Sequence, residues 1–256
     1  MTLIPLPAFS DNYIWMLHDG HGAMVVDPGD AQPVLDALQS ERVQLQAILV
    51  THHHADHTGG VDTLRQTTGA QVYGPAAEAI PQPARGLGSG DRVHAVGREF
   101  QVMDVPGHTA GHIAFFCPEM EGSPLLFCGD TLFSAGCGRL FEGTAAQMLH
   151  SLEQLAALPG ATRVCCTHEY TLSNLKFALE VEPGNAALVH YRAHAQQLRA
   201  QGLATLPSTM ALERSINPFL RSGEADVIAS ARAYDARAVD RQGVFATLRE
   251  WKNHYR

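Results

Sequence analysis

The stretch LQAILVTHHHADH, residues 45–57, joins an apolar run to a cluster of potential metal ligands. The apolar part predicts a buried strand. Side chains alternate at the end of a strand, so His52 and His54 point to one side and can face one ion together. Asp56 and His57 lie where the chain turns toward a helix, so they can face a second ion. Zinc accepts imidazole nitrogen and carboxylate oxygen at roughly 2.0–2.2 Å, and this stretch supplies both.

His53 alternates to the opposite side, so we do not expect it to be a ligand. Expression tags and surface loops can also be rich in histidine. This run, however, is internal, contains an acidic residue and follows an apolar strand rather than a polar linker. These features favour metal binding.

Four ligands from one turn cannot complete two metal sites, so distant residues are needed. Three expected strands end in suitable side chains: FQVMDV before His108, PLLFCG before Asp130 and RVCC before His168. A lone histidine is more often structural. The three segments nevertheless share one form, an apolar strand with a ligand at its tip, and ligands from several strand ends commonly meet at one edge of a fold. The predicted ligand set is His52, His54, Asp56, His57, His108, Asp130 and His168.

Composition limits the classes of protein to consider. The 256 residues are 45% hydrophobic and 17% charged, which predicts a compact fold rather than disorder. The net charge of −8 disfavours a nucleic-acid partner. Neither a signal peptide nor a transmembrane run is expected. Five cysteines, an odd number, suggest reduced thiols in the cytoplasm rather than a disulfide framework.

The chain changes character near residue 171. Before it, strand-like and helix-like segments alternate, which predicts an α/β fold. After it, helix-like segments dominate, at residues 172–181, 186–201, 224–238 and 244–252. We therefore expect a domain of residues 1–170 and a smaller helical domain of residues 171–256.

The metal motif resembles the His-x-His-x-Asp-His motif of the metallo-β-lactamase superfamily, and the whole chain more closely resembles its glyoxalase II family. The further matching segments are Asp11-Asn12-Tyr13, Val26-Asp27-Pro28-Gly29, Gly129-Asp130-Thr131-Leu132-Phe133, Gly136-Cys137-Gly138-Arg139, Glu142-Gly143-Thr144, Thr167-His168-Glu169-Tyr170-Thr171, Asn174-Leu175-Lys176-Phe177-Ala178, Glu182-Pro183-Gly184-Asn185 and Asn217-Pro218-Phe219. The metal motif specifies only the superfamily, whereas these segments specify the thioesterase branch.

The resemblance implies a four-layered αββα sandwich with a smaller C-terminal helical domain that completes the substrate site. It also implies how the ligands divide between two ions. One ion takes the positions of His52, His54 and His108, the other those of Asp56, His57 and His168, and Asp130 bridges both. Asp27 would be a structural residue near the site. Zinc is the expected metal, although iron and manganese accept the same ligand types.

The resemblance further implies a glutathione site lined by basic and aromatic residues from both domains, at Arg139, Phe141, Tyr170, Arg249 and Lys252. Many relatives have Lys-x-Tyr where this chain has Arg139-Leu140-Phe141, so Phe141 lacks the hydroxyl group that a tyrosine would offer. Taken without the resemblance, Arg249 and Lys252 are better explained as two solvated charges on one face of a terminal helix.

The implied reaction is hydrolysis of S-D-lactoylglutathione to glutathione and D-lactate, the second step of methylglyoxal detoxification. A hydroxide shared by the two ions would attack the thioester, with Asp56 and Asp130 as the catalytic carboxylates. The leaving thiolate needs no general acid, because the pKa of a thiol is about 8.5. We expect a small-molecule substrate, no nucleic-acid or membrane partner, and a monomer.

Two other classes compete with this interpretation. One is another enzyme of the superfamily, namely a persulfide dioxygenase, a β-lactamase or a lactonase. His168 and the long helical tail disfavour the dioxygenase. The other is a non-enzymatic scaffold or RNA-associated module that has kept the fold alone. Such a protein usually loses ligands, whereas all seven are present here, and the chain has no basic patch.

Overall fold

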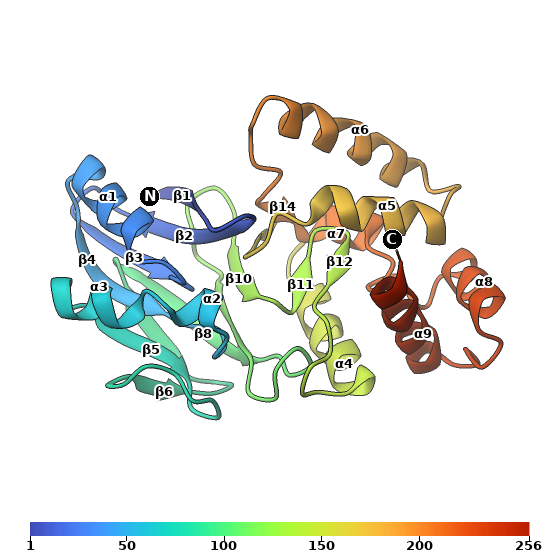
Figure 1. Cartoon of the computed structure of the whole chain (residues 1–256), viewed down its shortest axis with the longest axis horizontal. Coiled ribbons are helices and arrows are strands. Elements are labelled where there is room, and N and C mark those ends of the chain that lie inside the picture. The colour runs from blue at the N-terminus through green and yellow to red at the C-terminus, as the bar shows by residue number, and fades with distance from the viewer. Residues whose placement is uncertain (256) are drawn as a thin grey trace.

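Two six-stranded sheets lie face to face in the computed structural model, which describes residues 1–255 (Figure 1). The first sheet begins with antiparallel pairs and continues with parallel ones from its third strand onward. Its strands in spatial order are β1 (Thr2–Ala8), β2 (Asn12–His18), β3 (Gly22–Val26), β4 (Gln44–Leu49), β5 (Gln71–Pro75) and β6 (Arg85–Leu87).

The second sheet is antiparallel except for one parallel pair at its centre, between β10 and β13. Its strands in spatial order are β14 (Ser208–Thr209), β13 (Arg163–Cys166), β10 (Leu125–Gly129), β9 (Ile113–Cys117), β8 (Arg98–Asp104) and β7 (Arg92–Ala95). A small separate hairpin, β11 (Leu132–Phe133) with β12 (Gly136–Cys137), follows the end of β10.

Alternating side chains of β2 show why both faces of the first sheet are buried. Trp15 and Leu17 belong to the core that the two sheets share. Ile14 and Met16 point the other way, into the core beneath the outer helices. The indole nitrogen of Trp15 also donates a hydrogen bond to the carbonyl of Cys166 at 3.0 Å, which ties the first sheet to the second. A strand that is buried on both faces is expected to have a largely continuous apolar sequence, and β2 has one.

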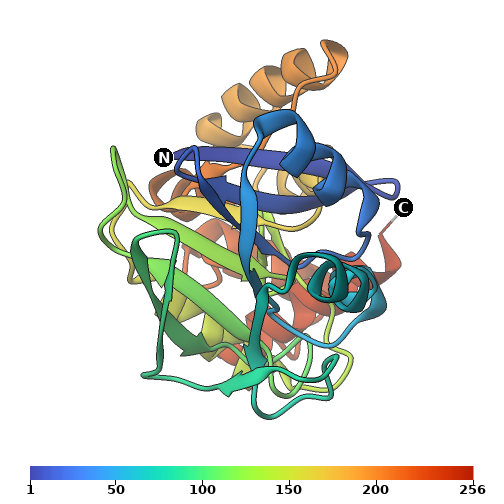
Figure 2. The same cartoon turned by 90° about the vertical axis from the view of Figure 1, so that its left-hand side faces the viewer.

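Helices form the outer layers. Figure 2 shows α1 (Gln32–Glu41) and α3 (Val61–Thr68) over the outer face of the first sheet, the face turned away from the second sheet, with the short α2 (Ala55–Thr58) beside them. On the far side, α4 (Ala145–Ala156) begins at Thr144 with a capping box and contacts the last helix of the chain. The αββα order expected from the resemblance is confirmed.

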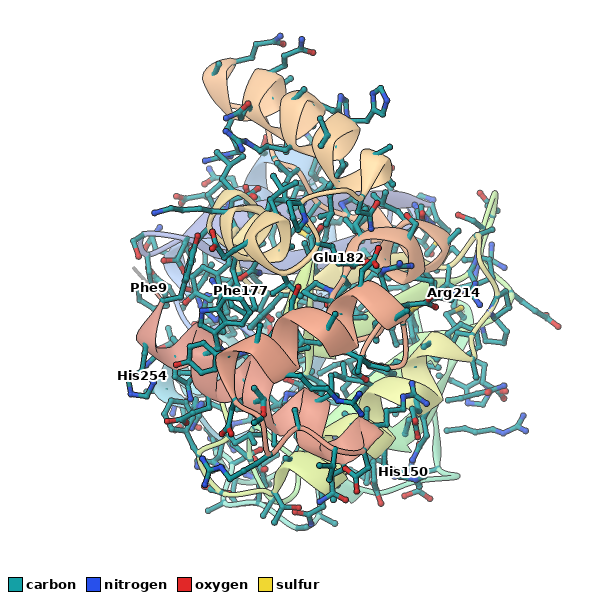
Figure 3. All side chains as sticks on the ribbon, turned by 90° about the vertical axis from the view of Figure 1, so that its right-hand side faces the viewer. Phe9, His150, Phe177, Glu182, Arg214 and His254 are labelled. Atoms are coloured by element: carbon teal, nitrogen blue, oxygen red, sulfur yellow. The ribbon has the colours of Figure 1, made fainter. Side chains whose placement is uncertain are left out.

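The C-terminal part is mainly helical. Phe177 is fully buried in it and packs against other aromatic rings (Figure 3). The Phe177 ring lies 6.0 Å from that of Phe219 and 5.3 Å from that of Trp251. The helices are α5 (Thr171–Val181), α6 (Ala186–Ala200), α7 (Met210–Ile216), α8 (Ala225–Tyr234) and α9 (Arg241–His254).

Some elements were not anticipated from the sequence. They are the strands β1, β2, β6, β7 and β14, the β11–β12 hairpin and the helices α2 and α7. Of these, β14 carries the helical part back into the second sheet by pairing with β13. The domain boundary at residue 171 stays a prediction. Among residues 1–255, no helix combines the length and the apolar character needed to cross a bilayer.

Candidate metal centre

The seven predicted ligands gather where strands of both sheets end. The turn after β4 supplies two of them and the following helix α2 two more, the turn between β8 and β9 supplies one, and the ends of β10 and β13 supply one each. They form two groups around one shared residue. The first ligand group is His52, His54 and His108, the second ligand group is Asp56, His57 and His168, and the shared residue is Asp130.

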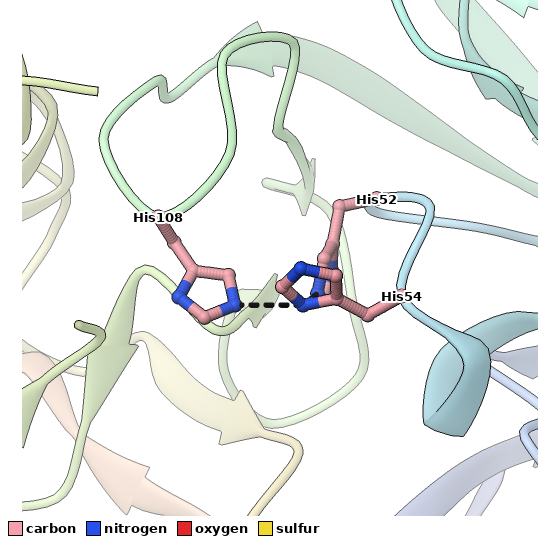
Figure 4. Close-up of side chains that lie close together, drawn as sticks. All are labelled: His52, His54 and His108. Atoms are coloured by element: carbon pink, nitrogen blue, oxygen red, sulfur yellow. Dashed lines mark hydrogen bonds between the residues drawn. The ribbon is translucent and has the colours of Figure 1, made fainter. Parts of the chain in front are cut away.

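The three imidazoles of the first ligand group converge (Figure 4). Nδ1 of His54 lies 3.1 Å from Nε2 of His52 and 3.1 Å from Nε2 of His108. A tetrahedral zinc ion with ligands at about 2.0–2.1 Å would separate its ligand atoms by about 3.3 Å. The observed spacing therefore fits three ligands of one ion.

The second ligand group is arranged in the same way. Oδ2 of Asp56 lies 3.6 Å from Nε2 of His57 and 3.6 Å from Nε2 of His168. The His57 ring is completely buried, whereas 43% of the Asp56 side chain is exposed. One edge of this group is therefore open to solvent.

Asp130 lies between the two groups and turns one carboxylate oxygen to each. Its Oδ2 lies 3.4 Å from Nε2 of His108. Its Oδ1 lies 3.4 Å from Nε2 of His57 and 3.3 Å from Nε2 of His168. Within residues 1–255, both Oδ1 of Asp130 and Nε2 of His57 are buried without a hydrogen-bond partner. Buried polar atoms are normally satisfied, so these two fit a metal centre at this position.

The pKa shifts of His57 and Asp130 also fit a site in which a metal ion replaces a proton. Burial lowers the pKa of His57, but the carboxylates of Asp130 and Asp27 outweigh burial and hold that pKa well above its usual range. Burial raises the pKa of Asp130, but the charges of His57 and His168 hold it well below its usual range. Without metal, a proton on His57 therefore balances the buried carboxylate. A cation bound here would replace that proton.

Carboxylates stand behind both imidazoles of the second ligand group. Nδ1 of His57 lies 3.1 Å from Oδ2 of Asp27, and Nδ1 of His168 lies 2.7 Å from Oδ1 of Asp11. Asp27 also accepts hydrogen bonds from the backbone nitrogen and the hydroxyl of Thr51, at 2.7 and 2.8 Å. Such partners fix the orientation of a ligating ring and raise its basicity.

Neutral groups stand behind the first ligand group. Nδ1 of His108 lies 2.9 Å from the carbonyl oxygen of Arg139, and Nδ1 of His52 lies 3.1 Å from the Thr51 hydroxyl. Burial, followed by the charge of His57, lowers the pKa of His52 well below its usual range. His52 is therefore held in the neutral form that binds metal.

The backbone at Gly129 and the ring of His112 position Asp130. Gly129 has a φ of +47°, and a Cβ there would lie 2.3 Å from the Thr51 hydroxyl oxygen. Only glycine can therefore make this turn. His112 accepts a hydrogen bond from the backbone nitrogen of Asp130 at 3.1 Å and stacks on His52 at 4.6 Å. His112 therefore has a structural role, because it supports both the backbone of Asp130 and the ring of His52.

A cavity of about 500 Å³ opens beside the two ligand groups. It is lined by His108 and Asp130 and by all five residues predicted to contact the substrate. The five are Arg139, Phe141, Tyr170, Arg249 and Lys252.

Aromatic rings frame the metal side of this cavity. Tyr170 stacks on His168 with a centroid distance of 4.7 Å and an interplanar angle of 4°. Phe141 meets the rings of His54 and His108 edge-on at 5.7 and 5.2 Å, while 62% of its surface is exposed. Each ligand group therefore has one ring at its rim.

Arg249 and Lys252 of α9, which were predicted to contact the substrate, both line this cavity. Arg249 is only 5% exposed, and its Nη1 donates to the carbonyl of Cys137 at 2.8 Å. Nζ of Lys252 donates to the carbonyl of Ser173 at 3.3 Å. Burial, followed by the charge of Arg249, lowers the pKa of Lys252 to about 8. Both side chains line the cavity, so the interpretation as two solvated charges is wrong for Arg249.

Sequence reasoning assigned no role to Asp11 and Asn12. Asp11 backs His168, and the amide of Asn12 donates to Oδ2 of Asp56 at 3.1 Å. Their only signal was the segment Asp11-Asn12-Tyr13 of the family resemblance. An isolated bridge between Asn12 and His168 brings this segment to the site.

Comparison with known proteins divides the chain between two family models. Residues 8–168 match the metallo-beta-lactamase superfamily, and residues 169–255 match the C-terminus of hydroxyacylglutathione hydrolase. The hydroxyacylglutathione hydrolase of Albidiferax ferrireducens is 64% identical over 100% of both chains. That of Methylobacillus flagellatus is 54% identical over 99% of both.

Solved structures share the fold. The structure of TTHA1623 in a di-iron-bound form is 28% identical with a TM-score of 0.61, covering 86% of this chain and all of that one. ETHE1 from Myxococcus xanthus, at 24% identity, superimposes with a TM-score of 0.67 over 98% of both chains.

We predict that Asp130→Ala abolishes tight binding at both sites, because one carboxylate faces both ligand groups. Elemental analysis after dialysis should give about two metal ions per wild-type chain and almost none for the variant. Asp62→Ala, on the exposed surface of α3, is the matched control and should keep the wild-type content. A variant that retains two ions would contradict the bridging role.

We also predict that Asp11→Asn weakens metal binding mainly at the second ligand group, because it removes the carboxylate behind His168. Loss of such a partner typically costs about 10–100-fold in affinity. Competition of metal-loaded protein with a chelator measures the change. Equal losses at both sites would show that Asp11 acts on the fold rather than on His168.

Proposed function

Because this chain belongs to the hydroxyacylglutathione hydrolases of the metallo-beta-lactamase superfamily, it hydrolyses hydroxyacylglutathione thioesters, and we propose that two metal ions in the seven-residue centre carry the reaction. The position of Asp130 between the two ligand groups is the observation that carries this proposal. The substrate we propose is S-D-lactoylglutathione, which yields glutathione and D-lactate.

His52, His54 and His108 would hold one ion, Asp56, His57 and His168 the other, and Asp130 both. Zinc is the metal we propose, since all seven donor residues carry imidazole or carboxylate groups typical of zinc sites and none is a thiolate. Iron is the alternative, because the 28% identical neighbour was solved in a di-iron-bound form. Such a pair of ions lowers the pKa of a bound water to about 7 and stabilises negative charge on a carbonyl oxygen.

The protein's own groups fix the geometry of the reaction. Asp130 sets the separation of the two ligand groups, and the cavity that Phe141 and Tyr170 line reaches His108 and Asp130 of the centre. Asp56 is the partly exposed carboxylate that is available to take a proton from the attacking water. The departing glutathione thiolate is a stable anion, so the chain needs no dedicated acid.

Local positive charge compensates for the acidic chain. The net charge is −8, yet the cavity contains Arg139, Arg249 and Lys252. We propose that Arg139 and Lys252 bind the carboxylates of glutathione, while Arg249 also holds the loop at Cys137. Arg139 comes from the proposed domain of residues 1–170 and Lys252 from that of residues 171–256, so the two domains build the site together.

We further propose that the enzyme acts as a monomer in the cytoplasm. All five cysteines are buried free thiols, which is consistent with a reducing compartment. Sedimentation equilibrium would test the monomer, and fractionation of the native cells would test the compartment.

The purified, metal-loaded protein should release free thiol from S-D-lactoylglutathione, and removal of the metal by a chelator should abolish the release. Readdition of zinc should restore it. A thioester of a thiol without the peptide, such as an acyl-N-acetylcysteamine, is the control and should react far more slowly. If thiol release is absent while two metals are bound, the glutathione assignment fails and the metal centre stands.

We predict that the KM of the wild-type enzyme rises about tenfold between pH 7 and pH 9, with little change in kcat. A factor of about ten corresponds to the loss of one hydrogen bond to a charged group. The pKa of Lys252 is about 8, so its ammonium group is present below that pH and lost above it. Lys252→Arg keeps the charge and should show a flatter KM profile. Identical profiles for the two proteins would exclude Lys252 as the titrating group.

A further inference from the structure

The carboxylate of Glu78, in the turn after β5, joins the two chain segments that carry the first ligand group. Its Oε2 accepts a hydrogen bond from the backbone nitrogen of His53 at 2.7 Å and lies 2.9 Å from the ring Nδ1 of the same residue. Its Oε1 accepts from the backbone nitrogen of Gly111 at 3.0 Å and from the hydroxyl of Thr109. His53 lies between His52 and His54, and Thr109 follows His108.

Burial makes these contacts mutually dependent. The Glu78 side chain is only 3% exposed, and a buried carboxylate is costly unless hydrogen bonds stabilise it. Removing the carboxylate would leave the buried Thr109 hydroxyl and the partly buried donors of His53 and Gly111 without this partner. A fully buried donor left unpaired costs about 1–3 kcal/mol. Glu78 therefore restrains one turn relative to the other.

The chain makes room for this contact at Gly111. A Cβ on Gly111 would lie 2.7 Å from Cγ of Glu78 and 2.9 Å from Cβ of Ala77. The backbone of Gly111 is not in the left-handed region, so space rather than conformational freedom explains the glycine. Any side chain at this position would push the turn that carries Glu78 away.

Glu142 adds a weaker connection on the solvent side. Its Oε2 accepts from the backbone nitrogen of Ala110 at 2.8 Å, and its Oε1 lies 3.4 Å from Nε2 of His53. Its side chain is 40% exposed, so solvent screens this contact more than that of Glu78.

We propose that Glu78 is a positioning residue that holds the first ligand group in the shape its metal ion requires. The second ligand group depends on other carboxylates, Asp27 and Asp11. Loss of Glu78 should therefore loosen one metal site and spare the other. This inference rests on the metal centre proposed above, and metal titration separates the failure of one from the failure of the other.

Glu78→Gln is the decisive variant, because it keeps the size of the side chain but replaces one accepting oxygen by an amide NH₂ group. That group is itself a donor and cannot accept the hydrogen bonds that the two turns offer. Metal-free protein is titrated with Zn²⁺ against a competing chelator, and the occupancy of each site is read by anomalous diffraction at the zinc edge. Zinc affinity at the first ligand group should fall about 10–100-fold, with a change of less than about threefold at the second.

Three further variants provide a second test, a reverse case and a control for this result. Gly111→Ala should reproduce the loss at the first ligand group through steric displacement, and it decides the question if Glu78→Gln does not fold. Asp11→Asn should show the reverse pattern. Glu99→Gln, on β8 and paired with Arg92, should leave both affinities unchanged.

Equal losses at both sites, or no loss at either, would overturn the positioning role of Glu78. A wild-type chain that binds no zinc at all would instead overturn the proposed metal centre.

Discussion

The buried carboxylate of Asp130 is the group on which the rest of the site depends, because its two oxygens face imidazoles from three separate segments. A negative charge in this position is stable only with a compensating charge close by. Protonated His57 supplies that charge when metal is absent, and cations would supply it when metal is bound. The ends of β4, β10 and β13 and the turn after β8 must therefore meet within a few ångströms, which the two facing sheets achieve.

The convergence of the seven candidate ligands could be predicted because most of the signal is local in sequence. The segment after β4 places four donors within residues 51–57. The alternation expected at a strand end correctly separated His52 and His54 from His53, although β4 itself ends at Leu49. His108, Asp130 and His168 each follow an apolar strand, so their convergence needed only the assumption that those strands end at one edge. The αββα order was predicted through the resemblance rather than from periodicity.

The supporting residues could not be predicted in the same way, because each acts across long distances in sequence. Asp11 reaches His168 over 157 positions, and Glu78 reaches Thr109 over 31. Neither Asp11 nor Glu78 directly follows an apolar strand of the kind that predicted the ligands. Their roles depend on which backbone turns lie side by side, and this is decided by tertiary packing. The strand β14 was missed for a related reason, since two residues are too short to show a period.

Besides lining the cavity, the helical part holds the β11–β12 hairpin in place, and this hairpin connects Asp130 to Arg139. Asn217 donates to the carbonyls of Phe133 and Gly136 at 3.1 and 2.9 Å, and Glu213 accepts from the backbone nitrogen of Ala135 at 2.8 Å. These buried contacts leave the hairpin little freedom. Since one end of the hairpin leads to Asp130 and the other to Arg139, the contacts from α7 set the distance between the metal centre and the proposed glutathione site. A thioester enzyme needs that distance fixed, because its scissile bond lies between the two.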